Sequence, residues 1–229
     1  MTTTAQLEQT RFNMIEQQIR TWDVLEPSVL ALLNVVKREK FLPAESKAFA
    51  FVDMEAPLPG GQCMLSPKVE ARALQDLKIQ KHEKVLEIGT GSGYMAALLG
   101  HRAQQVISLE IDSTLAQTAR ENLQKAGIYN AEVRTGDGAA KIAQSVSGSD
   151  PLRGPFDVIV LSGSVAEVPP ALLALLKVGG RLSAIVGDEP VMRATLITRV
   201  AEDAWRTTQA WDTVAPRLLN FPEPSRFSF

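Results

Sequence analysis

The chain has 229 residues, of which 45% are hydrophobic and 22% are charged, and its formal net charge is −2. These values are ordinary for a soluble globular protein of one large or two small domains, and they offer no argument for a nucleic-acid partner. The single cysteine, Cys63, excludes an internal disulfide framework and a multi-cysteine metal site, so we expect no metal ion.

The N-terminal part predicts helices over residues 4–50. A second helix is expected from Pro27 through Val36, since proline suits a first helical turn. The residues expected on one face of the first helix are Leu7, Phe12, Ile15, Ile19 and Trp22. Residues 2–9 lack the basic start and apolar run of a secretory signal, and no stretch of about 18 apolar residues predicts a membrane span. We therefore expect no membrane partner and a cytoplasmic location.

A loop rich in proline and glycine is expected over residues 51–66. Ser66 then has the residue type of a helix N-cap, and Pro67 fits the first position of the helix that follows. The apolar spacing continues this helix through Leu77.

From Val85 onward, strand and helix patterns alternate, which predicts a parallel sheet with helices on both faces. The strands expected in it are Val85–Ile88, Gln105–Glu110, Ala131–Arg134, Phe156–Leu161 and Arg181–Val186, with two more near Ala194–Val200 and Thr207–Thr213. Asp112 is a plausible N-cap. Another helix is expected to open at Pro169-Pro170 and end near Lys177, and Gly179-Gly180 is expected to form the turn into the fifth strand.

The fold class predicted is α/β, a doubly wound and mostly parallel sheet with an N-terminal helical extension. We expect one domain over residues 1–229, with helices and a loop in 1–78, the sheet core in 79–215 and a tail in 216–229. A polar surface loop is expected over residues 145–151, and an extended segment over 221–229.

A glycine-rich turn follows the first strand of this core. Gly89, Gly91 and Gly93 alternate there, and glycine lets the backbone reach positive φ and approach a ligand closely. A dinucleotide fingerprint requires a third glycine where this chain has Tyr94. No basic phosphate clamp accompanies the turn. The E-x-G-x-G-x-G form that begins at Glu87 resembles motif I of methyltransferases that use S-adenosylmethionine (SAM), a cofactor without phosphate.

Acidic residues follow three successive strands, at the sheet edge where ligands of open α/β sheets bind. Glu110 lies about 20 residues past the turn, where a carboxylate can accept both ribose hydroxyls. Asp137 follows the third strand and could accept from an adenine amino group. The residues expected to bind the cofactor are Glu87, Gly89, Thr90, Gly91, Ser92, Gly93, Glu110, Ile111, Asp137 and Gly138.

Several further motifs, spread over residues 11–190, give the chain a resemblance to the protein-L-isoaspartate O-methyltransferase family. They are Arg38–Pro43, Phe51–Asp53, Pro57–Gln62, Val85–Tyr94, Gly136–Gly138, Val168-Pro169 and Leu176–Leu182. The resemblance implies a Rossmann-like SAM-dependent fold, in which residues 79–215 bind the cofactor. It also implies that a protein or peptide carboxylate, at a damaged aspartyl or asparaginyl residue, accepts the methyl group.

The substrate loop departs from the family pattern G-Q-T-I-S-x-P. The family serine maps to Leu65 and its threonine to Cys63, while Ser66 comes one residue late. Cys63 and Ser66, beside the family position Leu65, are therefore the candidate catalytic residues. A lost hydrogen bond to the acceptor costs about 1–3 kcal/mol, or about 5- to 150-fold in rate. The C-terminal family signature is also missing around Arg217, which could face a substrate carboxylate or pair with a surface acid.

These departures leave other functions open. A SAM-dependent methyltransferase could act on a different acceptor, such as a small apolar molecule, since Leu65 makes the loop apolar. A non-enzymatic SAM-binding protein would bind the cofactor without turnover. A dehydrogenase that uses a nicotinamide cofactor would need the third glycine, which is absent. The sequence does not predict an oligomeric state.

Overall fold

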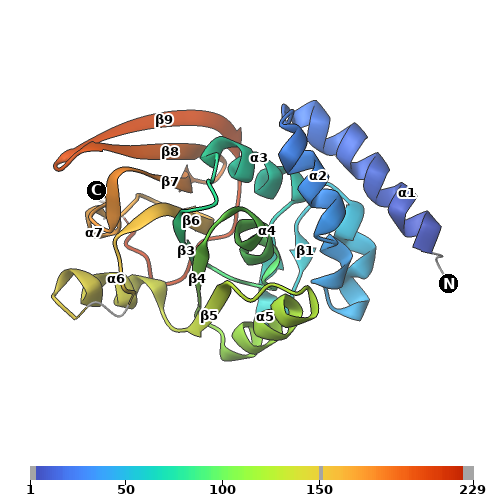
Figure 1. Cartoon of the computed structure of the whole chain (residues 1–229), viewed down its shortest axis with the longest axis horizontal. Helices are drawn as coiled ribbons and strands as arrows, with labels where there is room; N and C mark the ends of the chain where they lie inside the picture. Colours follow the sequence, from blue (N-terminus) through green and yellow to red (C-terminus); the bar gives the residue numbers. More distant parts are fainter. Residues whose placement is uncertain (1–3, 150–151, 224–229) are drawn as a thin grey trace, which may run out of the picture.

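The computed structural model describes residues 4–149 and 152–223. Its centre is a seven-stranded sheet with the order β5-β4-β3-β6-β7-β8-β9 (Figure 1). The strands are β3 (Lys84–Ile88), β4 (Gln105–Glu110), β5 (Ala131–Thr135), β6 (Phe156–Val165), β7 (Leu176–Asp188), β8 (Val191–Ala201) and β9 (Ala204–Thr213). The predicted α/β class is confirmed. Residues 150–151 of the predicted polar loop (145–151) and residues 224–229 of the predicted extended segment (221–229) lie outside the described part.

The sheet is parallel from β5 to β7 and antiparallel at β8 and β9. After β3 the chain adds β4 and β5 on one side of it, and then crosses over to add β6 on the other side. The strand order therefore switches at β3. This switch places the carboxyl ends of β3, β4 and β6 side by side. Ligands of open α/β sheets bind at such a point.

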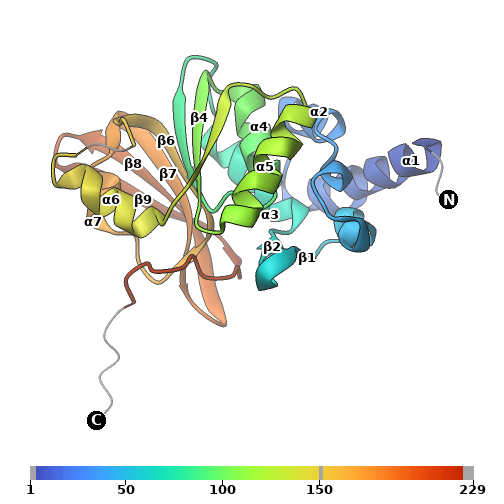
Figure 2. The same ribbon diagram turned by 90° about the horizontal axis from the view of Figure 1, so that it is seen from below.

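Helices cover both faces of the sheet (Figure 2). On one face lie α3 (Pro67–Leu77), α4 (Tyr94–Arg102) and α5 (Ser113–Lys125), and α1 (Thr4–Met14) and α2 (Pro27–Val35) lie beyond them. On the other face lie α6 (Gly138–Val146) and α7 (Pro170–Leu173). Each layer has its own apolar core. Leu98 and Leu99 are fully buried on the α4 side, and Phe156 and Leu172 on the α6–α7 side.

The N-terminal extension is helical, but it is broken into short pieces. A π-helical turn (Ile15–Ile19) and a 3₁₀ turn (Arg20–Trp22) follow α1, and further 3₁₀ turns span Arg38–Lys40, Ala44–Phe51 and Pro59–Gly61. The apolar face predicted for the first helix is partly wrong. Ile15 and Ile19 are buried, but Phe12 is 52% exposed, and Arg11 is buried in its place. Arg11 turns inward because its guanidinium pairs with Glu39, so Phe12 beside it faces outward.

Two expectations near the fifth strand are corrected by the structure. The helix expected from Pro169-Pro170 to near Lys177 ends at Leu173, and β7 begins at Leu176. The Gly179-Gly180 pair is a bulge inside β7 rather than a turn before it. Phe156 of β6 pairs with Leu176 of β7, and Val158 already pairs with Arg181, so β7 has extra residues between these two pairs. Gly179 has a φ of 83°, which suits glycine.

The loop before α3 contains a small hairpin of β1 (Ala56–Pro57) and β2 (Cys63–Met64). Ser66 occupies the predicted N-cap position of α3, but its side chain makes no capping hydrogen bond. Its backbone carbonyl instead accepts from the amides of Val69 and Glu70. The hydroxyl of Ser66 is thus not used in the way that its residue type suggested.

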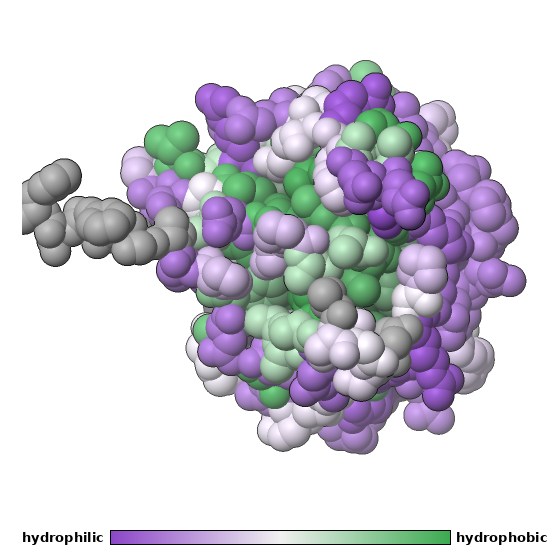
Figure 3. Space-filling view, turned by 90° about the vertical axis from the view of Figure 1, so that its left-hand side faces the viewer, coloured by the Kyte–Doolittle hydropathy of each residue, from purple (hydrophilic) through white to green (hydrophobic). Residues whose placement is uncertain are grey.

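The last three strands, β7, β8 and β9, follow one another without a helix between them. The β7–β8 connection is a direct hairpin, in which Asp188 pairs with Val191, so no helix is inserted there. Figure 3 looks onto the side with α6 and α7, where apolar side chains gather in a hollow framed by polar ones.

No described helix combines the length and apolar character needed to span a bilayer.

Candidate active site

The glycine turn forms the floor of a pocket at the carboxyl ends of β3, β4 and β6. Gly89, Gly91 and Gly93 have φ values of 93°, 53° and 86°, so each uses the conformation that glycine permits. A Cβ atom on Gly89 would lie 2.9 Å from the Leu218 side chain and 3.3 Å from the Ser162 carbonyl oxygen. The turn is therefore packed as closely as a backbone alone allows.

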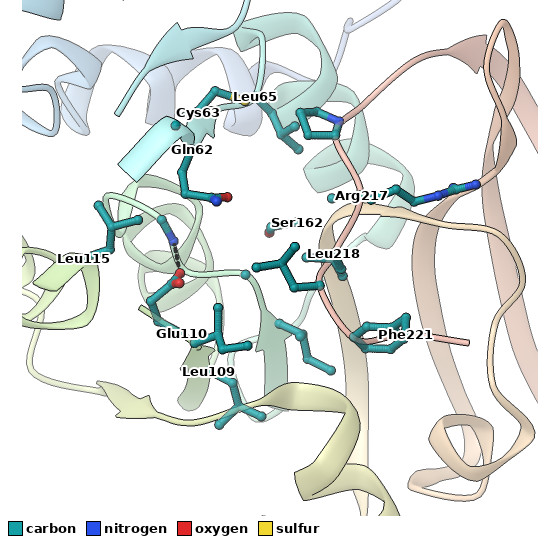
Figure 4. A pocket seen from close by; sticks show the side chains of 18 residues that line it. Gln62, Cys63, Leu65, Leu109, Glu110, Leu115, Ser162, Arg217, Leu218 and Phe221 are labelled. Atoms are coloured by element: carbon teal, nitrogen blue, oxygen red, sulfur yellow. Dashed lines mark hydrogen bonds between the residues drawn. The ribbon is translucent and has the colours of Figure 1, made fainter. Parts of the chain in front are cut away.

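Glu110 forms the wall of the pocket at the end of β4. It is 5% exposed, and its two carboxyl oxygens accept hydrogen bonds from the amides of Gly91 (2.7 Å) and Asp112 (3.1 Å). Burial raises the pKa of Glu110, while these backbone hydrogen bonds oppose the shift. Ile111 lies beside it as an exposed apolar residue at the rim. The carboxylate predicted to bind a ribose thus faces the pocket with defined orientation (Figure 4).

A chain of buried hydrogen bonds runs beneath the pocket from Thr90 to Ser162. The Thr90 and Ser108 hydroxyls are 2.5 Å apart, and Ser108 Oγ donates to Glu87 Oε2 over 2.6 Å. Ser162 Oγ donates to the other oxygen, Glu87 Oε1, over 2.8 Å. Glu87 has no exposed surface, and this burial raises its pKa to about 8 although the serine hydroxyls lower it. Burial thus favours the neutral acid, in which one of the two oxygens would carry the proton and donate to its serine partner.

The substrate loop forms the opposite wall. Cys63 and Leu65 line the pocket, whereas Ser66 is buried and is not among the lining residues. Arg38, which is fully buried, ion-pairs with Glu70 and donates to the Leu65 carbonyl over 2.6 Å. Burial raises the pKa of the Cys63 thiol to about 12, with a further contribution from the Glu55 carboxylate. Cys63 is therefore a neutral thiol.

A segment from Val214 to Phe221, which we call the strap, covers the pocket from above. The amide of Ser164 donates to the Pro216 carbonyl over 2.7 Å, and the Leu218 amide donates to the Ser164 carbonyl over 2.9 Å. Leu218 points into the pocket over the glycine turn, and Phe221 also lines the pocket (Figure 4).

Arg217 belongs to this strap and also lines the pocket, but its guanidinium is paired with carboxylates. It forms ion pairs with Asp188 and Glu223 and donates to the Gly187 carbonyl. The sequence left open whether Arg217 faces a substrate or pairs with an acid, and the structure has the second arrangement.

Asp137 and Gly138 follow β5 and do not line this pocket themselves, but they contact Ile88, which does, and the strap. Asp137 Oδ1 caps α6 by accepting from the amides of Ala139 and Ala140, and Oδ2 accepts from Asn220 of the strap over 2.9 Å. Gly138 lets this turn approach β3, since a Cβ there would lie 2.6 Å from Ile88. The adenine contact expected for Asp137 stays a prediction.

Sequence reasoning missed Ser162 and the apolar residues of the strap. Ser162 directly follows the predicted fourth strand, so its position at the ligand-binding edge was a usable signal. Leu218 and Phe221 carried no such signal, because the path of the strap over the sheet depends on tertiary contacts with Ser164.

The pocket suits a cofactor such as SAM in its chemistry. Its lining is largely apolar, and Arg217, the one lysine or arginine among the lining residues, is paired with carboxylates. Ser92 Oγ, buried beside the turn in an adjoining cavity, has no hydrogen-bond partner in the described part of the chain. A free hydroxyl, an oriented carboxylate and a backbone cradle together fit a polar ligand without phosphate.

The chain is similar to known proteins over most of its length. Residues 9–214 match the family described as protein-L-isoaspartate(D-aspartate) O-methyltransferase (PCMT). A protein-L-isoaspartate O-methyltransferase of Koribacter versatilis is 38% identical over 82% of this chain and 81% of its own. One of Rhodopseudomonas palustris is 35% identical over 93% of this chain and 96% of its own.

Solved structures share the fold. A Plasmodium falciparum protein, described as a protein-L-isoaspartate O-methyltransferase in complex with S-adenosyl-L-homocysteine, superposes with a TM-score of 0.75. Its sequence is 19% identical, and the match covers 92% of this chain and 97% of that one. At this identity the likeness establishes the arrangement of the chain around the sheet, including the N-terminal helices.

Proposed function

Because this chain belongs to the protein-L-isoaspartate(D-aspartate) O-methyltransferase family, we propose that it methylates the carboxylate of isoaspartyl residues in damaged proteins. The methyl donor is SAM. The observation that carries the proposal is the Glu110 carboxylate, fixed by the Gly91 amide beside three positive-φ glycines. This arrangement offers a ribose acceptor and a close backbone approach in one pocket.

The residues that would hold SAM lie on the turn and at the end of β4. Glu110 would accept from ribose hydroxyls with lone pairs that the backbone amides leave free. Ser92 would supply a hydroxyl to a polar group of the ligand, and Ile111 would pack against an apolar or aromatic face. The α4 N-terminus begins directly after Gly93, and its positive end favours a carboxylate.

The reaction needs little acid or base chemistry from the protein. SAM supplies a methyl group on a positively charged sulfonium. The acceptor oxygen forms the new bond to this carbon as the carbon–sulfur bond breaks, and sulfur keeps the electron pair. A carboxylate with a reference pKa of about 4 is already ionised at pH 7, so no general base is required. The protein has to align the acceptor and exclude water.

Apolar side chains are placed to exclude water from the reacting atoms. Leu65 comes from the substrate loop, and Leu218 and Phe221 come from the strap. A protein carboxylate would have to enter between these two walls. The protein or peptide acceptor thus fits the gap between the loop and the strap.

The first experiment is a calorimetric titration with SAM, followed by a methyl-ester assay on an isoaspartyl peptide and its aspartyl counterpart. We expect SAM binding and esters on the isoaspartyl peptide alone. Glu110→Gln should weaken SAM binding about 10-fold or more, because a charged acceptor is lost. Glu121→Gln, on the exposed face of α5, is the matched control and should leave binding unchanged.

Each failure has a distinct meaning. Binding without esters would favour a second candidate function, methylation of a different acceptor. The apolar cavity beside Leu65, lined also by Val69, Ile185 and Trp211, is the observation that favours such an acceptor. No SAM binding at all would contradict both functions.

A further inference from the structure

The proposed reaction needs a hydrogen-bond donor that orients the acceptor carboxylate. Leu65 has none, and Ser66 does not line the pocket. The Cys63 thiol is a weak donor, and it already makes a hydrogen bond with Glu55. Among the loop side chains that line the pocket, the Gln62 amide is the one strong donor, and it sits on an exposed side chain (Figure 4).

Ser162 faces this same space from the opposite wall. It lies in β6 at the sheet edge, is half-buried, and occupies the middle of the pocket in Figure 4. Leu65 and Ser162 both line the main pocket and both adjoining cavities. The two residues thus bound the junction of these three spaces, with a hydroxyl on one side and an isobutyl group on the other.

Ser162 Oγ donates to Glu87 Oε1 when this carboxyl group is ionised, so its hydrogen can turn toward the pocket only when Glu87 is protonated. Ser162 Oγ is 2.8 Å from Glu87 Oε1, and Ser108 donates to the other oxygen of this carboxyl group. When Glu87 carries a proton, its O–H can donate to Ser162 Oγ, since Oε2 already accepts from Ser108. The Ser162 hydrogen is then free to point into the pocket. Burial, which raises the Glu87 pKa to about 8, favours this form at neutral pH.

The fixed end of the hydrogen-bond chain also limits how far Ser162 can move. Thr90 and Ser108 hold Glu87 from below, and the Ser162 carbonyl abuts the glycine turn at Gly89. A donor that is already oriented loses little freedom when a substrate binds, so its hydrogen bond contributes more to alignment.

We propose that Ser162 donates the hydrogen bond that orients the acceptor carboxylate, in the place of a hydroxyl from the substrate loop. This inference rests on the proposed function, because it assigns a donor for the same reaction. Ser162 would touch the acceptor and would not contribute to cofactor affinity. In this chain the orienting hydroxyl would come from position 162 in β6 rather than from position 65 in the loop.

The test is steady-state methylation of an isoaspartyl peptide, with SAM affinity measured by calorimetry on each variant. Ser162→Ala should lower kcat/KM about 10- to 100-fold while the SAM Kd stays within about 2-fold. Ser162→Thr keeps the hydroxyl and should stay near the wild type. Ser145→Ala, a hydroxyl on α6 far from the pocket, is the matched control.

A compensating variant separates this role from a merely structural one. Leu65→Ser places a hydroxyl on the loop, so Leu65→Ser/Ser162→Ala should recover at least about 10-fold of the lost kcat/KM. Unchanged activity of Ser162→Ala, or no recovery in a folded double variant, would overturn the inference. If Ser162→Ala fails to fold, Ser162→Cys keeps the volume with a weak donor and should show a similar loss. If the wild type binds SAM without forming esters, the proposed function fails first and this inference with it.

Discussion

Cys63 illustrates how its surroundings set the reactivity of a single residue. It lies in the substrate loop, half-buried, in a position that could suit a nucleophile. Burial and the nearby Glu55 carboxylate raise its pKa to about 12. Only the thiolate is a strong nucleophile, so a thiol with this pKa is nearly unreactive at neutral pH.

We therefore expect slow alkylation of Cys63 by iodoacetamide at pH 7.5. The rate should be at least about 10-fold below that of glutathione, whose thiol has an ordinary pKa. Because Cys63 is the only cysteine of the chain, the mass gained on alkylation reports on it alone. Glutathione in the same tube is the control. A rate equal to that of glutathione would show that the thiol titrates normally.

The residues that the sequence could place are those whose role depends on the backbone. Gly89 follows β3 and Glu110 is the last residue of β4, and the position of a strand end is readable from the apolar run before it. The partners of Glu87 were not readable, because Ser108 and Ser162 lie 21 and 75 residues further on. Only the parallel register of β3 with β4 and β6 brings these hydroxyls together.

Among the elements, the strap contributes most to closing the site. It is held by main-chain hydrogen bonds to Ser164, and the Ser164 hydroxyl donates to the Ala215 carbonyl over 2.7 Å. Leu218 packs over Gly89 and Gly163, where a Cβ on Gly163 would be 2.8 Å from its side chain. The strap and the glycine turn are therefore complementary in shape.

We expect Leu218→Ala to weaken SAM binding about 5- to 30-fold, because it removes about 1–2 kcal/mol of apolar contact over the turn. Calorimetric titration with SAM measures the change. Val214→Ala, at a 49% exposed position of the same strap, is the control and should leave the Kd within about 2-fold. Equal affinities of the two variants would mean that the strap does not cover the bound ligand.

The elements that the sequence misjudged share one physical cause. The helix expected up to Lys177 ends at Leu173 because β6 recruits Leu176 into the sheet. Arg11 is buried in the N-terminal helices because it pairs with Glu39, a residue 28 positions away. In both places a distant contact decided the local structure, and local spacing carries no information about that contact.

At the scale of the whole molecule, Glu87 couples stability to pH. Its folded-state pKa of about 8 exceeds the ordinary value of 4.5, so the folded chain holds a proton that the unfolded chain releases above about pH 5. Through Glu87, stability should therefore fall as pH rises from about 5 to about 8, by at most about 1.4 kcal/mol per pH unit, and Glu70, whose pKa burial raises to about 7, adds to the fall. The carboxyl groups of Glu83 and Asp157 have lowered pKa values and titrate below this window.

Chemical denaturation at pH 5.5, 7 and 8.5 measures this slope. Glu87→Gln should make it less steep, because the amide resembles the protonated acid and does not titrate, and Glu70 accounts for the slope that remains. The free energy of unfolding of the variant should rise relative to that of the wild type as pH rises. Parallel curves for the two proteins would contradict a buried neutral Glu87.

The pocket also joins distant parts of the sequence. Its walls come from residues 61–65, from the turn at 89–91, from the end of β4, from β6 and from the strap at 216–221. A growing chain on the ribosome would thus complete most of the sheet before residue 221 emerges. The pocket therefore cannot close until the chain has been synthesised as far as residue 221.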